Sequence, residues 1–270
     1  MRLSPILTTL LPLCLGAPTH LVARQKSSRT TYSGGGTASD VQRGVCAPIT
    51  VLFARGTSEM GNIGSVIGPP LFSALVRLTN GNIALQGLNY AAGFEGDFTL
   101  GSSDGPKMTQ LARQTLQQCP STKIVMSGYS QGCLVIHNSL NSGQLSNNGG
   151  VVAVLYFGDP LYNKARSGSL PASKIKSYCA SGDGVCLSGG FSITAGHLSY
   201  GSDAQQAAQW IIQTYDSRDA TLGRPWSVVG EDHVDHAQPN QNTYQGRQGE
   251  MVAGIPESHF AGDATGGGQA

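Results

Sequence analysis

The pentapeptide Gly128-Tyr129-Ser130-Gln131-Gly132 constrains this chain more than any other stretch. It follows an apolar run at 123–127 that predicts a short buried strand, and it precedes an apolar stretch at 133–140 that predicts a helix. The two glycines permit a sharp turn in which backbone segments approach closely. A strand, a tight turn and a helix in this order lift the hydroxyl of Ser130 above a sheet, where it can act as a nucleophile.

Apolar runs alternate with amphipathic stretches from residue 43 to residue 217. The runs predict strands at 49–54, 83–90, 123–127, 151–157 and 174–179. The amphipathic stretches predict helices from Pro69 to Asn80 and at 106–118, 133–140 and 200–215, whereas 91–105 is predicted to be a glycine-rich loop. The run at 151–157 is apolar almost throughout, as in strands that are buried on both faces of a parallel sheet. The alternation therefore predicts one α/β domain with a parallel sheet at 43–217.

The two ends of the chain differ from this domain. A positive start and the apolar run Ile6–Leu15 predict a secretory signal peptide at 1–16, which is too short to span a bilayer. Residues 17–42 are predicted to form a leader with a flexible Ser/Gly-rich linker, and 218–270 a disordered polar tail. The tail contains His233 and His236, but their spacing matches no standard metal site. We expect a secreted extracellular protein without a transmembrane segment.

Composition excludes one class of partner. Lys and Arg total 17 and Asp and Glu total 16, so the chain has no basic excess that would indicate nucleic-acid binding. Charged residues are 12% of the chain, about half the usual share, which is compatible with a secreted protein. We expect a monomer that needs neither a metal nor an organic cofactor.

Removal of Cys14 with the signal peptide leaves five cysteines, so one thiol stays unpaired within the chain. Cys179 and Cys186 are close enough in sequence to close a small loop. Cys133 lies on the apolar start of a predicted helix, where a small buried hydrophobic residue is expected. These choices leave Cys46 with Cys119, although the sequence alone permits other pairings.

A serine hydroxyl needs a base, usually histidine, before it becomes an effective nucleophile. His20 lies in the leader, and three other histidines lie in the predicted tail. His137 is seven residues beyond Ser130 on the same predicted helix, about 10 Å along its axis and too far for a hydrogen bond. His197 remains as the predicted base.

A carboxylate should orient the histidine, and it should lie between serine and histidine in the order of the α/β hydrolases. Asp159 and Asp183 are the only acidic residues between Gln131 and Gly196. Asp159 precedes a proline, where a turn is a sufficient explanation. Asp183 lies between two cysteines whose disulfide would hold it rigid, and it is therefore preferred.

An oxyanion needs at least two hydrogen-bond donors. The amide of Gln131, the residue after the nucleophile, is the first candidate. Thr57, in the polar loop after the first predicted strand, is the second, and it offers both its amide and its hydroxyl.

Five segments together resemble the fungal cutinases, a group that also includes acetylxylan esterases. They are Ala54-Arg55-Gly56-Thr57-Ser58-Glu59, Gly128-Tyr129-Ser130-Gln131-Gly132, Phe157-Gly158-Asp159-Pro160, Gly182-Asp183-Gly184-Val185-Cys186 and His197-Leu198-Ser199-Tyr200. The resemblance covers about residues 44–217, with the segments in the family's order. It implies a three-layer α/β/α sandwich around a mostly parallel five-stranded sheet, without a large lid.

The resemblance also implies residue roles. Ser130, Asp183 and His197 would form the catalytic triad, and Thr57 and Gln131 the oxyanion hole. The family's two disulfides correspond to Cys46–Cys119 and Cys179–Cys186. The 91–105 loop departs from the family pattern, because some members have an asparagine there that supports the oxyanion hole, where this chain has Asp97.

The sequence favours cutin-type polyesters and short-to-medium acyl esters as substrates. Apolar side chains in the segments beside the predicted triad would suit an aliphatic chain. The predicted substrate contacts are Phe94, Leu187, Phe191 and Ile193. The alternatives are an acetylxylan esterase, or a non-catalytic surface-binding protein that has kept the fold.

Overall fold

The computed structural model describes residues 28–145 and 150–219 of the 270. The predicted signal peptide at 1–16, most of the predicted tail, and His233 and His236 lie outside the described residues. No helix in the two described ranges is both long and apolar enough to cross a membrane.

Five parallel strands form one sheet in the order β2-β1-β3-β4-β5. The strands are β1 (Ile49–Ala54), β2 (Ala84–Gly87), β3 (Lys123–Tyr129), β4 (Val151–Phe157) and β5 (Ile175–Tyr178). Every residue of β1 and β4 is buried, as their continuous apolar character predicts. The predicted parallel α/β architecture is confirmed.

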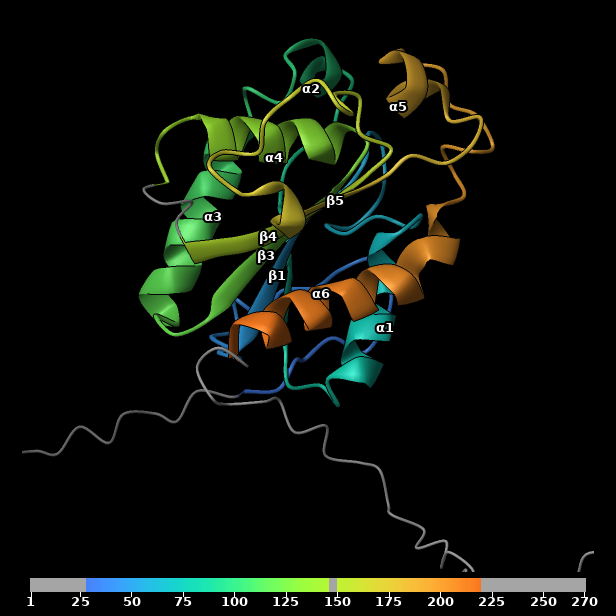
Figure 1. The fold of residues 1–270 in the computed structure, drawn as a ribbon. Helices are drawn as coiled ribbons and strands as arrows, with labels where there is room; N and C mark the ends of the chain where they lie inside the picture. The colour runs from blue at the N-terminus through green and yellow to red at the C-terminus, as the bar shows by residue number, and fades with distance from the viewer. Residues whose placement is uncertain (1–27, 146–149, 220–270) are drawn as a thin grey trace, which may run out of the picture. The chain divides into compact units, whose positions relative to one another are not determined.

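Helices cover both faces of the sheet, as Figure 1 shows. The long helices are α1 (Gly68–Leu78), α3 (Gly105–Gln118), α4 (Gln131–Asn141) and α6 (Ala204–Asp219). Two single-turn helices, α2 (Glu95–Phe98) and α5 (Gly184–Ser188), lie on the loops after β2 and β5. The cores on the two faces consist of α1 with α6 and of α3 with α4, each packed on the sheet.

Successive side chains of a strand point to opposite faces of the sheet, so each strand contributes to two separate hydrophobic cores. Val51 and Phe53 of β1 contribute to the core on the α1 and α6 face, whereas Leu52 and Ala54 contribute to the core on the α3 and α4 face. All four side chains have no exposed surface. Because helices cover both faces of the sheet, a site can form only at the ends of the strands. All the strands run the same way, so one edge of the sheet carries only their carboxyl ends and the opposite edge only their amino ends.

Several boundaries differ from the sequence prediction. The predicted strand at 83–90 is shortened to the four residues of β2, and the predicted loop at 91–105 contains α2. The predicted helix at 200–215 begins as a 3-10 turn (Tyr200–Asp203) and continues as α6 to Asp219, beyond the predicted domain end.

The segment before β1 is not a flexible linker in its described part, which corrects the prediction for residues 28–42. Ser39 forms an antiparallel bridge with Gln86, so this segment covers the outer edge of β2, the first strand of the sheet. The fully buried carboxylate of Asp40 accepts hydrogen bonds from the Thr30 hydroxyl, from the amide and hydroxyl of Thr31, and from the amide of Leu85. The Ser/Thr-rich composition suggests a linker, but the threonines of this segment donate hydrogen bonds to the buried carboxylate.

Asp40→Ala should lower the free energy of unfolding by about 3 kcal/mol, because it removes the acceptor of four hydrogen bonds, one of them from the buried amide of Leu85. Urea unfolding measures the change. Gln42→Ala is the matched control, since Gln42 is exposed in the same segment, and it should shift stability by less than about 0.5 kcal/mol. Equal stability of the two variants would mean that the segment does not stabilise the domain.

Candidate active site

Ser130 sits on a strained turn between β3 and α4. Its backbone has φ 53° and ψ −120°, a conformation that costs a residue with a side chain about 1–3 kcal/mol. The turn requires both flanking glycines. A Cβ on Gly132 would lie 2.0 Å from the carbonyl oxygen of Ala54, and one on Gly128 would lie 2.7 Å from the carbonyl carbon of Gly132. The close approach predicted from the pentapeptide is therefore present.

The turn lies where the strand order reverses. The chain passes from β1 outward to β2 and then returns to β3 on the other side of β1. Consequently the loops that follow β1 and β3 diverge and leave a crevice at the carboxyl ends of the strands, where open α/β sheets place their ligands. Thr57 follows β1 and Ser130 follows β3, which explains how residues that are far apart in sequence meet here.

The structure brings Ser130, His197 and Asp183 together in a hydrogen-bonded chain. His197 Nε2 lies 3.0 Å from Ser130 Oγ. His197 Nδ1 lies 3.0 and 2.9 Å from the two carboxylate oxygens of Asp183. Since an ionised carboxylate only accepts hydrogen bonds, Nδ1 carries a proton and Nε2 is free to accept one from Ser130.

Asp183 is fully buried and is held by several donors. It caps α5, where Oδ1 accepts from the amide of Val185 at 2.8 Å, and Oδ2 accepts from the Tyr200 hydroxyl at 2.5 Å. Burial alone would raise the pKa of the Asp183 carboxyl, but the hydrogen bonds from Tyr200 and His197 outweigh burial and lower this pKa below its usual value. The carboxylate therefore stays ionised without contact with water.

The ring of His197 fits a close-packed space beside Asp183. Gly158 has φ +59°, and a Cβ there would lie 2.7 Å from His197 Cε1 and 3.0 Å from Asp183 Oδ2. The hydroxyl of Tyr129 donates to the backbone carbonyl of His197 at 2.9 Å, and the two rings lie 5.0 Å apart. The space left by one glycine and a hydrogen bond from one tyrosine thus fix the position of the histidine.

Two disulfides are present, Cys46–Cys119 and Cys179–Cys186. The second closes a loop around Asp183 and anchors α5, so the carboxylate sits on a short covalent ring. Cys133 is unpaired and fully buried, and burial raises the pKa of its thiol well above the ordinary value. It is therefore a packed core residue rather than a reactive thiol.

The two predicted oxyanion donors lie side by side. The amides of Thr57 and Gln131 have no acceptor within the described part of the chain. The side chain of Gln131 donates through Nε2 to the carbonyl of Gly93 at 2.7 Å and to Thr57 Oγ1 at 3.2 Å. The Thr57 hydroxyl in turn contacts the carboxylate of Asp97, at 2.9 and 3.1 Å. The sequence predicts that this hydroxyl donates to the oxyanion, and the Asp97 carboxylate competes for the same hydroxyl proton.

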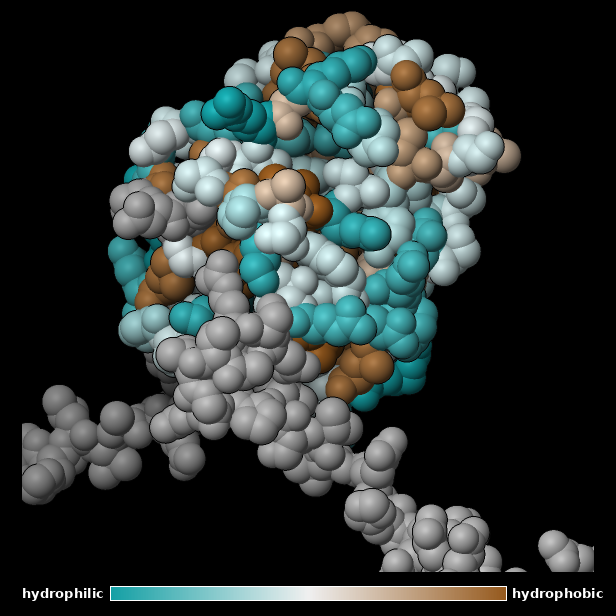
Figure 2. Space-filling model, in the orientation of Figure 1, coloured by the Kyte–Doolittle hydropathy of each residue, from teal (hydrophilic) through white to brown (hydrophobic). Residues whose placement is uncertain are grey.

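A cavity of about 630 Å³ opens beside Ser130 and His197. Its walls carry large apolar side chains that remain exposed, namely Phe94, Phe98, Leu100, Phe191, Ile193 and Leu198. Figure 2 shows apolar surface gathered over α2 and beside α5. Three of the four predicted substrate contacts line this cavity. Leu187 is the exception, because it lies on α5 with 62% of its surface exposed and is not among the residues that line the cavity.

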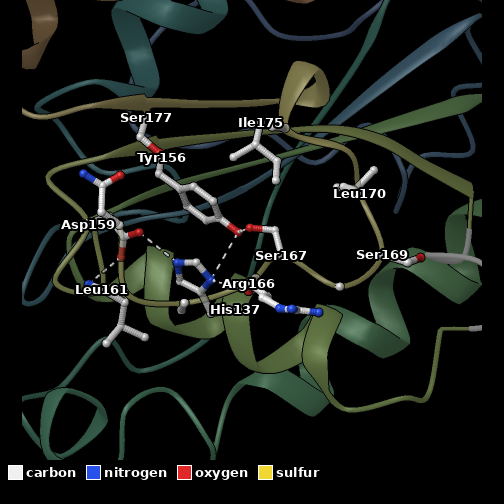
Figure 3. Close-up of a pocket in the computed structure, with 14 residues that line it drawn as sticks. His137, Tyr156, Asp159, Leu161, Arg166, Ser167, Ser169, Leu170, Ile175 and Ser177 are labelled. Carbon is white, nitrogen blue, oxygen red and sulfur yellow. Dashed lines mark hydrogen bonds and ion pairs between the residues drawn. The ribbon is translucent and has the colours of Figure 1, made fainter.

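A second cavity, of about 450 Å³, is lined by His137 of α4, by Tyr156 of β4 and by the turn after β4 (Figure 3). Here His137 Nε2 lies 2.8 Å from Asp159 Oδ2, and the ring of His137 stacks on Tyr156. The other oxygen of Asp159 accepts from the amide of Leu161 at 2.9 Å, which is the turn role predicted for this aspartate. His137 thus ties α4 to the turn that begins with Gly158, and it does not contact Ser130.

Four residues near the site had no assigned role from the sequence. They are Tyr129, Gly158 and Tyr200, which position His197 or Asp183, and Asp97 beside Thr57. Tyr200 and Gly158 lie in the segments that carry the family resemblance, three residues after the histidine and directly before Asp159, and this proximity was the available signal. For Asp97 the signal was the resemblance, which places it in the loop where some members have an asparagine that supports the oxyanion hole.

A hydroxyl on a strained strand-to-helix turn, with a histidine and a buried carboxylate behind it at the carboxyl ends of a parallel sheet, defines the class of α/β serine hydrolases. Within this class, the family model described as Cutinase matches residues 45–215. The chain belongs to the cutinase family and is a serine carboxylic ester hydrolase.

Individual relatives agree with this assignment. Cutinase 4 of Emericella nidulans is 46% identical over 183 residues, which cover 66% of this chain and 77% of that protein. Among solved structures, the Trichoderma reesei cutinase in complex with a phosphonate inhibitor is 34% identical, with a TM-score of 0.61 over 67% of this chain and 80% of that one. An acetylxylan esterase structure is 25% identical, with a TM-score of 0.52 over 63% of this chain and 99% of that one.

Tyr200→Phe tests the hydrogen bond that holds Asp183 ionised. The pKa of Asp183 is lower in the folded protein than in the unfolded chain, so its ionised form stabilises the fold above about pH 4, and this contribution is lost as the pH falls through the folded value. The variant should lose about 2 kcal/mol of unfolding free energy at pH 7 and about tenfold in kcat. Because the variant depresses the pKa less, its deficit should shrink below about pH 4.

Tyr178→Phe is the matched control, because the Tyr178 hydroxyl is buried without a partner in the described part of the chain. It removes the same atom and should leave both stability and kcat near those of the parent. Urea unfolding at pH 7 and pH 3.5, together with ester hydrolysis, measures both variants. A Tyr200→Phe deficit that stays constant with pH would argue against a role in holding the charge.

Proposed function

We propose that Ser130 attacks the carbonyl carbon of an ester while His197 Nε2 accepts its proton. Asp183 holds the resulting imidazolium through Nδ1. His197 then passes the proton to the leaving alcohol, which leaves an acyl group on Ser130. Water attacks this acyl-enzyme with His197 again as base, and the acid is released.

The observation that carries this proposal is the chain from Ser130 Oγ through both nitrogens of His197 to Asp183, with contacts of 2.9–3.0 Å. The ring orientation supports it, because Nδ1 faces the carboxylate and Nε2 faces the hydroxyl. The free amides of Thr57 and Gln131 lie at the crevice beside Ser130 and would bind the carbonyl oxygen as it gains charge.

Ser130→Ala should lower kcat on p-nitrophenyl butyrate by about four orders of magnitude or more, because the nucleophile is lost while the binding groups remain. Thermal unfolding should show that the variant folds. The parent, but not the variant, should form a covalent adduct with an organophosphonate at Ser130, as mass spectrometry of the peptide would detect. Full turnover by the variant would refute the assignment, and a parent that forms no adduct would favour a non-catalytic binding protein.

The finer proposal concerns the substrate, which we infer to be a cutin-type polyester or a short-to-medium acyl ester. The cavity beside Ser130 is lined by apolar side chains from two segments, among them Phe98 and Phe191, whose rings lie 5.6 Å apart. Both are mostly exposed, at 76% and 66%. Such walls gain stabilisation when an aliphatic chain removes them from water.

Phe191→Ser should lower kcat/KM on p-nitrophenyl butyrate and on a polycaprolactone suspension by about tenfold, because it removes an apolar wall of the cavity. Its matched control is Leu187→Ser, which removes a comparably exposed apolar side chain that does not line the cavity. Equal losses in both variants would point to nonspecific adsorption rather than to binding in the cavity.

Acetylated xylan is the alternative substrate, and the structural likeness to an acetylxylan esterase is the observation in its favour. The parent enzyme should release little acetate from acetylated xylan relative to acid from polycaprolactone. Strong acetate release without polyester hydrolysis would reverse the substrate assignment and leave the mechanism unaffected.

We also infer that the enzyme is secreted. The apolar run at 6–15 after a positive start has the form of a signal peptide, and two disulfides are stable in an oxidising compartment.

A further inference from the structure

The carboxylate of Asp97 lies directly behind the Thr57 hydroxyl. The residue is 9% exposed, and both carboxylate oxygens are within hydrogen-bond distance of Thr57 Oγ1. The ion pairs between described residues involve Asp104, Asp159 and Asp183, so in the described part of the chain no cation neutralises Asp97. Within the described residues, the Thr57 hydroxyl is the donor that contacts this carboxylate, which lines the cavity.

The orientation of the Gln131 amide limits what that hydroxyl can do. Nε2 lies 2.7 Å from the carbonyl oxygen of Gly93, which only accepts, so this atom is the nitrogen and not the oxygen of the amide. Nε2 also lies 3.2 Å from Thr57 Oγ1, which must accept there. The one proton of the hydroxyl can then point only to Asp97 or to the oxyanion.

An ionised carboxylate accepts hydrogen bonds and donates none. The Thr57 proton therefore goes to Asp97 in the resting enzyme, and a charged acceptor of this kind competes on equal terms with an oxyanion. The negative charge of Asp97 also lies on the side of the crevice where negative charge would develop.

We infer, on the basis of the function proposed above, that Asp97 is a positioning residue that withholds the Thr57 hydroxyl from the oxyanion. The oxyanion is then bound by the backbone amides of Thr57 and Gln131. An amide at position 97 would release the hydroxyl. Its nitrogen would donate to Thr57 Oγ1 alongside Gln131 Nε2, which fills both lone pairs and leaves the hydroxyl proton for the oxyanion.

Asp97→Asn should therefore raise kcat on p-nitrophenyl butyrate about tenfold with little change in KM, since one additional oxyanion donor is worth up to about 10²–10³ in kcat. The inhibition constant of an alkyl boronic acid, which forms a tetrahedral anion on the serine, should fall by a similar factor. Asp97→Ala also removes the acceptor, so it should likewise raise kcat and lower the inhibition constant. The test therefore does not depend on the folding of one variant.

Two controls separate this mechanism from a general charge effect. Asp104→Asn removes one carboxylate charge from another buried aspartate, which pairs with Lys107 and lies outside the cavity, and it should not raise kcat. In a Thr57→Val background the gain from Asp97→Asn should disappear, because no hydroxyl is left to release. An equal gain in that background, or a fall in kcat for both Asp97 variants, would overturn the inference. If Ser130→Ala is inactive in the same assays, such a result leaves the proposed function standing.

Discussion

A fully buried carboxylate is the feature around which the rest of the site is built. Asp183 has no exposed surface, and a buried charge is unfavourable unless donors surround it. The Val185 amide, the Tyr200 hydroxyl and His197 Nδ1 supply them. The first donor lies on the same short helix that Asp183 caps, and the other two lie three residues apart on the segment 197–200, so the carboxylate holds two pieces of chain together.

The cost of this arrangement appears in the backbone around it. Gly158 is required because any side chain there would strike His197 and Asp183, and Gly196 is required because a Cβ would lie 2.6 Å from the carbonyl oxygen of Ser181. The Cys179–Cys186 disulfide closes the same loop. Buried charge, crowded backbone and covalent ring reinforce one another, and each limits the motion of Asp183 relative to His197.

The sheet and the spacing of reactive residues could be predicted because their signals are local and apolar. Runs such as 151–157 can be satisfied only by burial, and the glycines around Ser130 reflect a contact that tolerates no side chain. The packing of residues 28–42 could not be predicted, because a Ser/Thr-rich segment resembles a linker until Asp40 is seen to gather its donors. The absence of Leu187 from the cavity lining likewise depends on the position of one residue on a single helical turn.

The short helix α2 links substrate binding to the oxyanion site. Its consecutive residues Asp97 and Phe98 serve different contacts, since Asp97 is nearly buried against Thr57 whereas Phe98 is 76% exposed and contacts the ring of Phe191. Gly96 packs against the side chain of Gln131, where a Cβ would lie 2.7 Å from its amide carbon. An acyl chain that displaces the backbone of α2 through Phe98 would therefore also shift Asp97 and the contact of Gly96 with Gln131. Substitutions in α2 that are intended to widen the acyl cavity should for this reason alter kcat as well as KM.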